Sequence, residues 1–131
     1  MAERLQPFLM FEGRAEEALN FYISLIPDSR IESIMRYGPQ GPGPEGSVMA
    51  ANATIGGLPV MVSDSYVKHA FSFTPSLSLF LNCTGDEEIE RLSAALAEGG
   101  GVLMPLDNYG FSRRFAWVND RFGVSWQLNL P

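Results

Sequence analysis

Side chains that commonly carry nucleophilic, acid–base and metal chemistry are scarce in this sequence, which has one cysteine and one histidine among 131 residues. The single cysteine, Cys83, excludes an intramolecular disulfide, and its apolar neighbours favour a buried, unreactive thiol. No stretch approaches the roughly 20 apolar residues of a membrane-spanning helix, and no apolar signal segment opens the chain. We therefore expect a cytoplasmic protein with no membrane partner.

Positive charge is also in short supply. Nine Lys and Arg residues stand against 15 Asp and Glu, which gives a net charge of −6. Such a surface repels phosphate backbones, so nucleic acid is not an expected partner. Hydrophobic residues make up 46% and charged residues 18%, a balance that excludes a disordered chain. The length predicts one domain, residues 1–131, with a core of its own.

The first half of the chain changes its apolar period from strand to helix and back to strand. The expected elements are, in order, a strand at 5–11, a helix from Ala15, and strands at 30–37, 47–55 and 58–63. Prolines and glycines at 38–46 cannot continue a strand ladder, so this segment is expected to be a loop. The first half therefore reads β-α-β-β-β.

The second half shows the same order of periods. Its expected elements are a strand at 76–82, a helix from Thr84 with a capping box to Glu87, and strands at 101–105, 113–119 and 124–130. With an offset of 66 residues, Met61 falls on Gln127 in the last strand of each half. The sequence thus predicts two modules of one kind, at 1–70 and 71–131.

The whole chain resembles the vicinal-oxygen-chelate superfamily, the group of glyoxalase I, bleomycin-resistance proteins and extradiol dioxygenases. The residues that carry the resemblance are 8–22 (FLMFEGRAEEALNFY), 68–71 (KHAF), 105–115 (PLDNYGFSRRF) and 120–127 (DRFGVSWQ). Within the superfamily the chain looks like the PhnB-like branch, often labelled 3-demethylubiquinone-9 3-methyltransferase domain proteins. The resemblance implies an α+β fold in which two βαβββ modules form a curved eight-stranded mixed sheet around a ligand site. It also implies a homodimer.

The resemblance also places four positions that hold a metal ion in metal-using relatives, mostly through His and Glu. Here these positions carry Pro7, Met61, Ser76 or Ser78, and Gln127. Proline has no ligating side chain, and only Gln127 offers an oxygen of the kind that a hard cation accepts. We therefore expect no metal ion and no other cofactor.

A mixed apolar and polar lining suits a small organic ligand, and we predict one on the inner face of the sheet. The predicted ligand-binding residues are Phe11, Met61, Ser63, Ser78, Phe80 and Gln127. Period-2 alternation directs Gln127 inward while Trp126 and Leu128 face the helix side. Packing within the core would explain the same residues, and that interpretation stays open here.

His69 is the one candidate for a general acid or base, because imidazole is the side chain best suited to proton transfer at neutral pH and Ser65 is close to it in sequence. No G-x-S-x-G segment accompanies it, and a histidine bonded to backbone in a connector is the alternative, so no catalytic residue is assigned. Arg113 and Arg114 should point to opposite faces of their strand, so at most one can reach an anionic ligand.

The segment 41–46 formally matches G-x-G-x-x-G, but its prolines remove backbone donors and a strand, not a helix, follows it. A dinucleotide or S-adenosylmethionine site is therefore not expected there. Three functions remain in competition: metal-independent binding of a small organic molecule, a glyoxalase- or dioxygenase-type metalloenzyme, and the methyltransferase of the family label. The missing ligand set favours the first.

Overall fold

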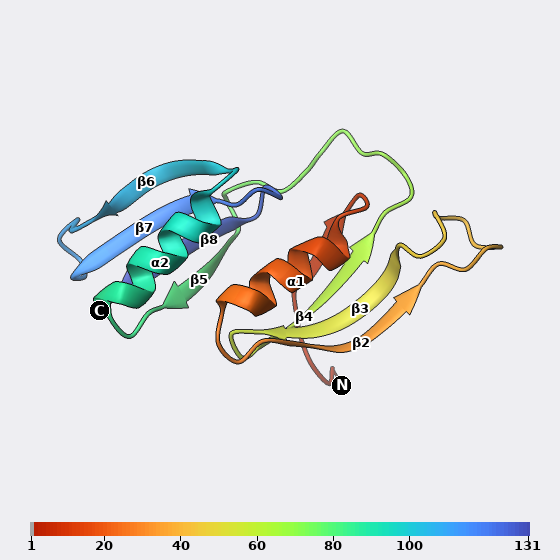
Figure 1. Ribbon diagram of the computed structural model, residues 1–131, viewed down its shortest axis with the longest axis horizontal. Coiled ribbons are helices and arrows are strands. Elements are labelled where there is room, and N and C mark those ends of the chain that lie inside the picture. The colour runs from red at the N-terminus through yellow and green to blue at the C-terminus, as the bar shows by residue number, and fades with distance from the viewer. Residues whose placement is uncertain (1) are drawn as a thin grey trace. The chain divides into compact units, whose positions relative to one another are not determined.

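The computed structural model describes residues 2–131 and divides the chain into two units, one running to His69 and the other from Ala70 to Pro131. Each unit contains four strands and one helix in the order β-α-β-β-β, as the sequence predicts (Figure 1). The class is α+β. The eight strands are hydrogen-bonded as two separate four-stranded sheets, where a single sheet was expected. Among the described residues, no helix has the length and apolar character to cross a lipid bilayer.

The first unit is a mixed sheet with a helix packed on one side. Its elements are β1 (Phe8–Phe11), α1 (Ala15–Leu25), β2 (Arg30–Arg36), β3 (Val48–Ile55) and β4 (Leu58–Asp64). The strand order is β1-β4-β3-β2, with β1 parallel to β4 and the other pairs antiparallel. The parallel pair is the one whose connection includes the helix, because parallel neighbours need a long crossover.

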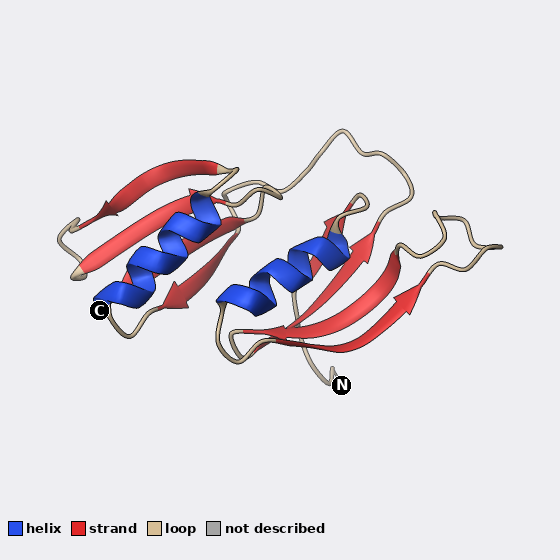
Figure 2. Ribbon diagram, in the orientation of Figure 1, coloured by secondary structure: helices blue, strands red, loops and turns tan. Residues whose placement is uncertain are grey.

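The second unit repeats this arrangement. Its elements are β5 (Ser78–Asn82), α2 (Asp86–Ala97), β6 (Gly101–Asp107), β7 (Arg114–Asn119) and β8 (Ser125–Leu130). The strand order is β5-β8-β7-β6, and β5 is parallel to β8. In both units the helix covers one face of the sheet (Figure 2). We call the other face of each sheet its helix-free face.

The core of each unit lies between its helix and its sheet. Ala18, Leu19 and Tyr22 of α1 are buried, and so are Val60 and Val62 of β4 beneath them. Alternation along β4 leaves the intervening residues on the helix-free face. Burying the side chains of one helix face in this way typically contributes about 1.5–3 kcal/mol for each large apolar residue.

Helix α2 packs in the same way through Ile89, Leu92 and Leu96, which are fully buried. Its N-terminus differs from the expected capping box by one residue. The carboxylate that reaches back to the backbone N–H of Thr84 belongs to Glu88, at 2.9 Å, and not to Glu87. The reciprocal side-chain cap is missing, because the helix begins after Gly85 rather than after Thr84.

Strand register supports the equivalence of Met61 and Gln127. Met61 pairs with Phe8 in the parallel ladder of the first unit, and Gln127 pairs with Phe80 in that of the second. Each residue thus lies in the last strand of its unit beside a phenylalanine of the first strand.

Candidate ligand-binding face of the second sheet

The helix-free face of the second sheet carries an ordered grid of polar and aromatic side chains. Register places Gln127 of β8 between Phe80 of β5 and Trp117 of β7. One neighbouring row consists of Ser78, Ser125 and Asn119. The other consists of Asn82, Asn129 and Phe115. The residues between these along β8 are buried against the helix, so alternation fixes which side chains share the face.

Hydrogen bonds tie two rows of this grid together, and one more runs within the third row. The Trp117 indole N–H donates to Ser125 Oγ at 2.8 Å, and Ser125 Oγ lies 2.7 Å from Ser78 Oγ. Gln127 Nε2 donates to Ser78 Oγ at 3.3 Å. In the third row, Asn129 Nδ2 donates to Asn82 Oδ1 at 3.0 Å. The amide of Gln127 is therefore held by its nitrogen.

Aromatic rings border one end of the grid. Phe115 is buried beneath Phe80, Tyr109 and Phe111, with ring centroids 6.4, 6.2 and 5.0 Å away. Phe80 and Phe111 remain 55% and 64% exposed, which is a large apolar area for a surface. Exposed aromatic groups beside polar ones are typical of surfaces that bind another molecule.

The structure brings together three of the six predicted ligand-binding residues, namely Ser78, Phe80 and Gln127. Met61 and Ser63 lie on the helix-free face of the first sheet, in register with Phe8 and Met10. Phe11 lies on the other side of that sheet, buried and paired with the buried Asp64, so its placement on the inner face needs correction.

Several residues of the face were not identified from the sequence: Ser125, Trp117, Asn119, Asn129 and Phe115. Alternation along β7 and β8 was the signal that could have found them. Alternation does not specify which strands pair, and the pairing of β7 with β8 is what brings these side chains beside Gln127.

The four positions that the resemblance equates with metal ligands carry side chains that are poor ligands. The backbone N–H of Met61 donates to the carbonyl of Pro7 at 2.9 Å, and Gln127 bonds to Ser78. These residues provide a thioether, a hydroxyl and an amide, a donor set that does not fit a transition metal. In residues 2–131, no three His, Cys, Asp or Glu side chains gather in a group able to hold a metal ion.

His69 does form a contact with a serine, although its geometry does not favour catalysis. Nε2 of His69 lies 3.0 Å from Ser65 Oγ. The hydroxyl of Ser65 also donates to the carbonyl of Val67 at 2.9 Å, within a tight turn. Because a hydroxyl has one proton, this bond leaves Ser65 as the acceptor from His69, which is the reverse of nucleophile activation.

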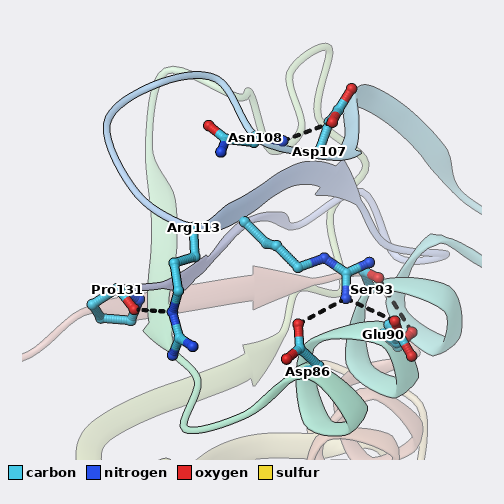
Figure 3. A network of polar contacts seen from close by, with 8 residues as sticks. Asp86, Glu90, Ser93, Asp107, Asn108, Arg113 and Pro131 are labelled. Carbon is cyan, nitrogen blue, oxygen red and sulfur yellow. Dashed lines mark hydrogen bonds and ion pairs between the residues drawn. The ribbon is translucent and has the colours of Figure 1, made fainter.

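The structure distinguishes the two neighbouring arginines. Arg114 Nη1 lies 2.7 Å from Glu90 and 3.1 Å from Asp86 of α2, so its side chain is on the helix side. Its hydrogen bonds to Glu90 and Asp86 raise the pKa of its guanidinium. Arg113 instead donates from Nε to the carbonyl of Pro131 at 2.7 Å (Figure 3). Arg113 is therefore the arginine directed away from α2.

The G-x-G-x-x-G segment has a structural explanation. It lies in the loop between β2 and β3, and the backbone of Gly43 packs on the ring of Tyr37. A Cβ at Gly43 would come within 2.7 Å of that ring. The loop therefore holds the buried Tyr37 and does not present backbone donors at a helix N-terminus, as a nucleotide cofactor would require.

The first unit has a polar cleft of about 480 Å³, which contains none of the six predicted ligand-binding residues. Arg30 in its wall lies 2.8 Å from Glu32 and 3.2 Å from Asp28, so it forms an ion pair with each of these carboxylates. The buried Oε1 of Gln6, a further lining residue, has no partner in the described chain.

Comparison with known proteins identifies the group to which this architecture corresponds. Residues 3–129 match the family described as 3-demethylubiquinone-9 3-methyltransferase. The structure of a PhnB protein from Bacillus cereus is 52% identical, covers 98% of this chain and 100% of its own, and has a TM-score of 0.95. Protein YjdN of Escherichia coli is 27% identical over 96% of this chain and 94% of its own.

A more distant structure shows the same fold. The fosfomycin resistance protein FosX of Listeria monocytogenes, solved with Mn(II) and dihydroxypropylphosphonic acid, is 12% identical with a TM-score of 0.64. The alignment covers 98% of this chain and 93% of FosX.

Proposed function

Given that the chain belongs to the 3-demethylubiquinone-9 3-methyltransferase family, a PhnB-like branch of the vicinal-oxygen-chelate superfamily, we propose that it binds a small organic molecule without a metal ion. The proposed site is the helix-free face of the second sheet. The cytoplasm is the compartment in which we expect it to act.

One observation carries the proposal: the amide of Gln127 lies between two aromatic side chains in adjacent strands, Phe80 and Trp117. Apolar and aromatic side chains together with a few fixed polar groups are the usual lining of a small-molecule site. The polar groups here are fixed, because Trp117, Ser125, Ser78 and Gln127 form one connected chain of hydrogen bonds. Because these side chains are already held in place, little further conformational entropy is lost when a ligand binds.

Metal independence is supported by the donor set at Met61, Ser78 and Gln127. In a glyoxalase- or dioxygenase-type metalloenzyme, a metal would have to polarise paired substrate oxygens. It would need several anionic or imidazole ligands to stay bound. This part of the proposal separates the protein from metal-using members of the superfamily.

The family label supplies the second candidate, a methyltransferase. The loop at 41–46 packs on Tyr37 and follows a strand that leads into another strand, so it lacks the geometry of a nucleotide cofactor loop. We expect no binding of S-adenosylmethionine in a calorimetric titration. A micromolar dissociation constant would favour the methyltransferase instead.

The binding proposal can be tested with the two tryptophans, which give two indole signals in a ¹H–¹⁵N spectrum. Protein treated with EDTA is titrated with 2-naphthol as a flat probe. The Trp117 indole signal should shift saturably, while that of Trp126, on the helix side, stays nearly unchanged.

Variants locate the contact. Phe80→Ala should weaken binding by about fivefold or more, because it removes the exposed ring beside Gln127. Met35→Ala, an exposed apolar truncation in the first unit, is the matched control and should bind like the wild type. Absence of any saturable Trp117 shift, or a shift that requires added zinc or manganese, would contradict the proposal.

A further inference from the structure

We infer that the ligand of the second sheet presents hydrogen-bond donors to the protein, as a hydroxyl-, amine- or N–H-bearing flat molecule does. This inference rests on the proposed function and adds the class of ligand. It follows from a count of protons and lone pairs across the face.

The chain of hydrogen bonds that ends at Gln127 has a definite direction. Trp117 can only donate, so Ser125 accepts from it. Because the Ser78 proton goes to the carbonyl of Pro75, the proton between the two serines is that of Ser125. The Ser78 hydroxyl is then directed to the carbonyl of Pro75, 3.5 Å away, and it accepts from Gln127 Nε2. Every hydroxyl proton is used once in this order. The Oε1 atom of Gln127 is left without a donor in the described chain.

Two further amide oxygens on the same face also accept no hydrogen bond from the described residues. Asn129 uses its nitrogen to bond to Asn82, and its own Oδ1 has no donor among residues 2–131. Oδ1 of Asn119, in the row of Ser125, is buried without a partner in the described structure. Asn82, on the edge strand β5, has the opposite arrangement, with its oxygen engaged.

Unpaired carbonyl oxygens beside aromatic rings select among ligands. A hydroxyl or amine donor placed over Gln127 satisfies Oε1, whereas an ether or a carboxylate brings a second set of lone pairs against it. A polar group that loses water without gaining a partner is costly, so the wrong ligand is rejected more strongly than the right one is attracted. Neutral or cationic donors are therefore favoured over anions.

The test uses three probes with one ring system: 2-naphthol, 2-methoxynaphthalene and 2-naphthoate. The first can donate, the second cannot, and the third is an anion. Dissociation constants are taken from the Trp117 indole shift at pH 7. We expect 2-naphthol to bind about tenfold more tightly than either of the others, the usual effect of one well-placed hydrogen bond.

Two substitutions at Gln127 examine the same point. Gln127→Met keeps the length of the side chain and removes the oxygen, so the preference for 2-naphthol over 2-methoxynaphthalene should fall from about tenfold to about twofold. Gln127→Glu keeps an acceptor and adds negative charge, so the preference for 2-naphthol should remain and 2-naphthoate should bind least.

The possible results are distinguishable. Equal affinities of the wild type for 2-naphthol and 2-methoxynaphthalene would preserve the binding face and overturn the donor inference. Tighter binding of 2-naphthoate would show that the amide nitrogens face the ligand, which also overturns it. If no probe shifts Trp117, or if its signal depends only on protein concentration because a second copy covers the face, both the inference and the proposed function fail.

Discussion

The indole nitrogen of Trp126 donates a hydrogen bond of 2.9 Å to Oδ2 of Asp120, and both side chains are buried. The other carboxylate oxygen accepts from the backbone N–H groups of Phe122 and Val124, at 2.8 and 3.0 Å. One buried carboxylate thus fixes the turn between β7 and β8 and anchors the residue that precedes Gln127. The position of the candidate site depends on this turn.

We predict that Asp120→Ala destabilises the second unit by about 3 kcal/mol, because it leaves an indole N–H and two backbone N–H groups without acceptors. Urea unfolding followed by tryptophan fluorescence measures the change. Asp107→Ala is the matched control: Asp107 is exposed, and within residues 2–131 its side chain bonds only to the backbone of Asn108, so its loss should cost about 0.5 kcal/mol or less (Figure 3). Equal effects of the two substitutions would contradict the role of Asp120.

Purified and dialysed protein should contain no stoichiometric divalent metal. The reason is the donor set at Met61, Ser78 and Gln127, and a single added carboxylate in Gln127→Glu should still hold a metal only weakly. Elemental analysis of both proteins provides the measurement. Near one equivalent of zinc, nickel, manganese or iron in the wild type, lost in Gln127→Ala, would show that this interpretation of the site is wrong.

The thiol of Cys83 should react slowly in the native protein. Burial, together with the negative charge of Glu88, raises its pKa from 9.0 to about 11, with Arg91 opposing the shift. Alkylation by iodoacetamide at pH 8 should be about 100-fold slower than in guanidinium, where the thiolate forms at its ordinary pKa.

The same shift has a consequence for stability. The folded chain holds the Cys83 proton more tightly than the unfolded chain, so this contribution is present below about pH 9 and is lost as the pH rises toward 11. The free energy of unfolding of Cys83→Ala should therefore fall less over that range than that of the wild type. Parallel curves would contradict the shift.

A homodimer is expected in solution. The superfamily resemblance motivates this prediction, and so do exposed apolar side chains of the first unit such as Phe8 and Met35, which remain 55% and 59% accessible. Sedimentation equilibrium at micromolar concentration should give about twice the chain mass of 14.4 kDa. A value near 14.4 kDa would contradict it.

The local pattern of apolar and polar residues was sufficient to predict the order of strands and helices. The change of period at Ala15 and the prolines of 38–46 mark the ends of strands through short-range chemistry, and the structure places α1 and the loop there. Alternation was also sufficient to predict the side of the strand on which Gln127 lies. Its neighbours Trp126 and Leu128 are apolar and face the core, so Gln127 faces the opposite side.

Alternation failed at Phe11 for a definite reason. Residues 8–11 of β1 are all apolar, so the strand has no polar side to mark its helix-free face. The pairing of Phe11 with Asp64 and of Phe8 with Met61, formed across more than 50 residues, decided which side each one takes. Long-range contacts also decided which of the two neighbouring arginines faces the helix. Ion pairs with the acidic residues of α2 place Arg114, and not Arg113, on the helix side.

The sequence by itself therefore determined the two βαβββ units, the family and the side of its strand on which Gln127 lies, since these depend on neighbours along the chain. Tertiary structure decided what surrounds Gln127. Phe80, Ser78, Trp117 and Ser125 come from three strands, and strand register, which is set by long-range pairing, is the physical reason that they meet there.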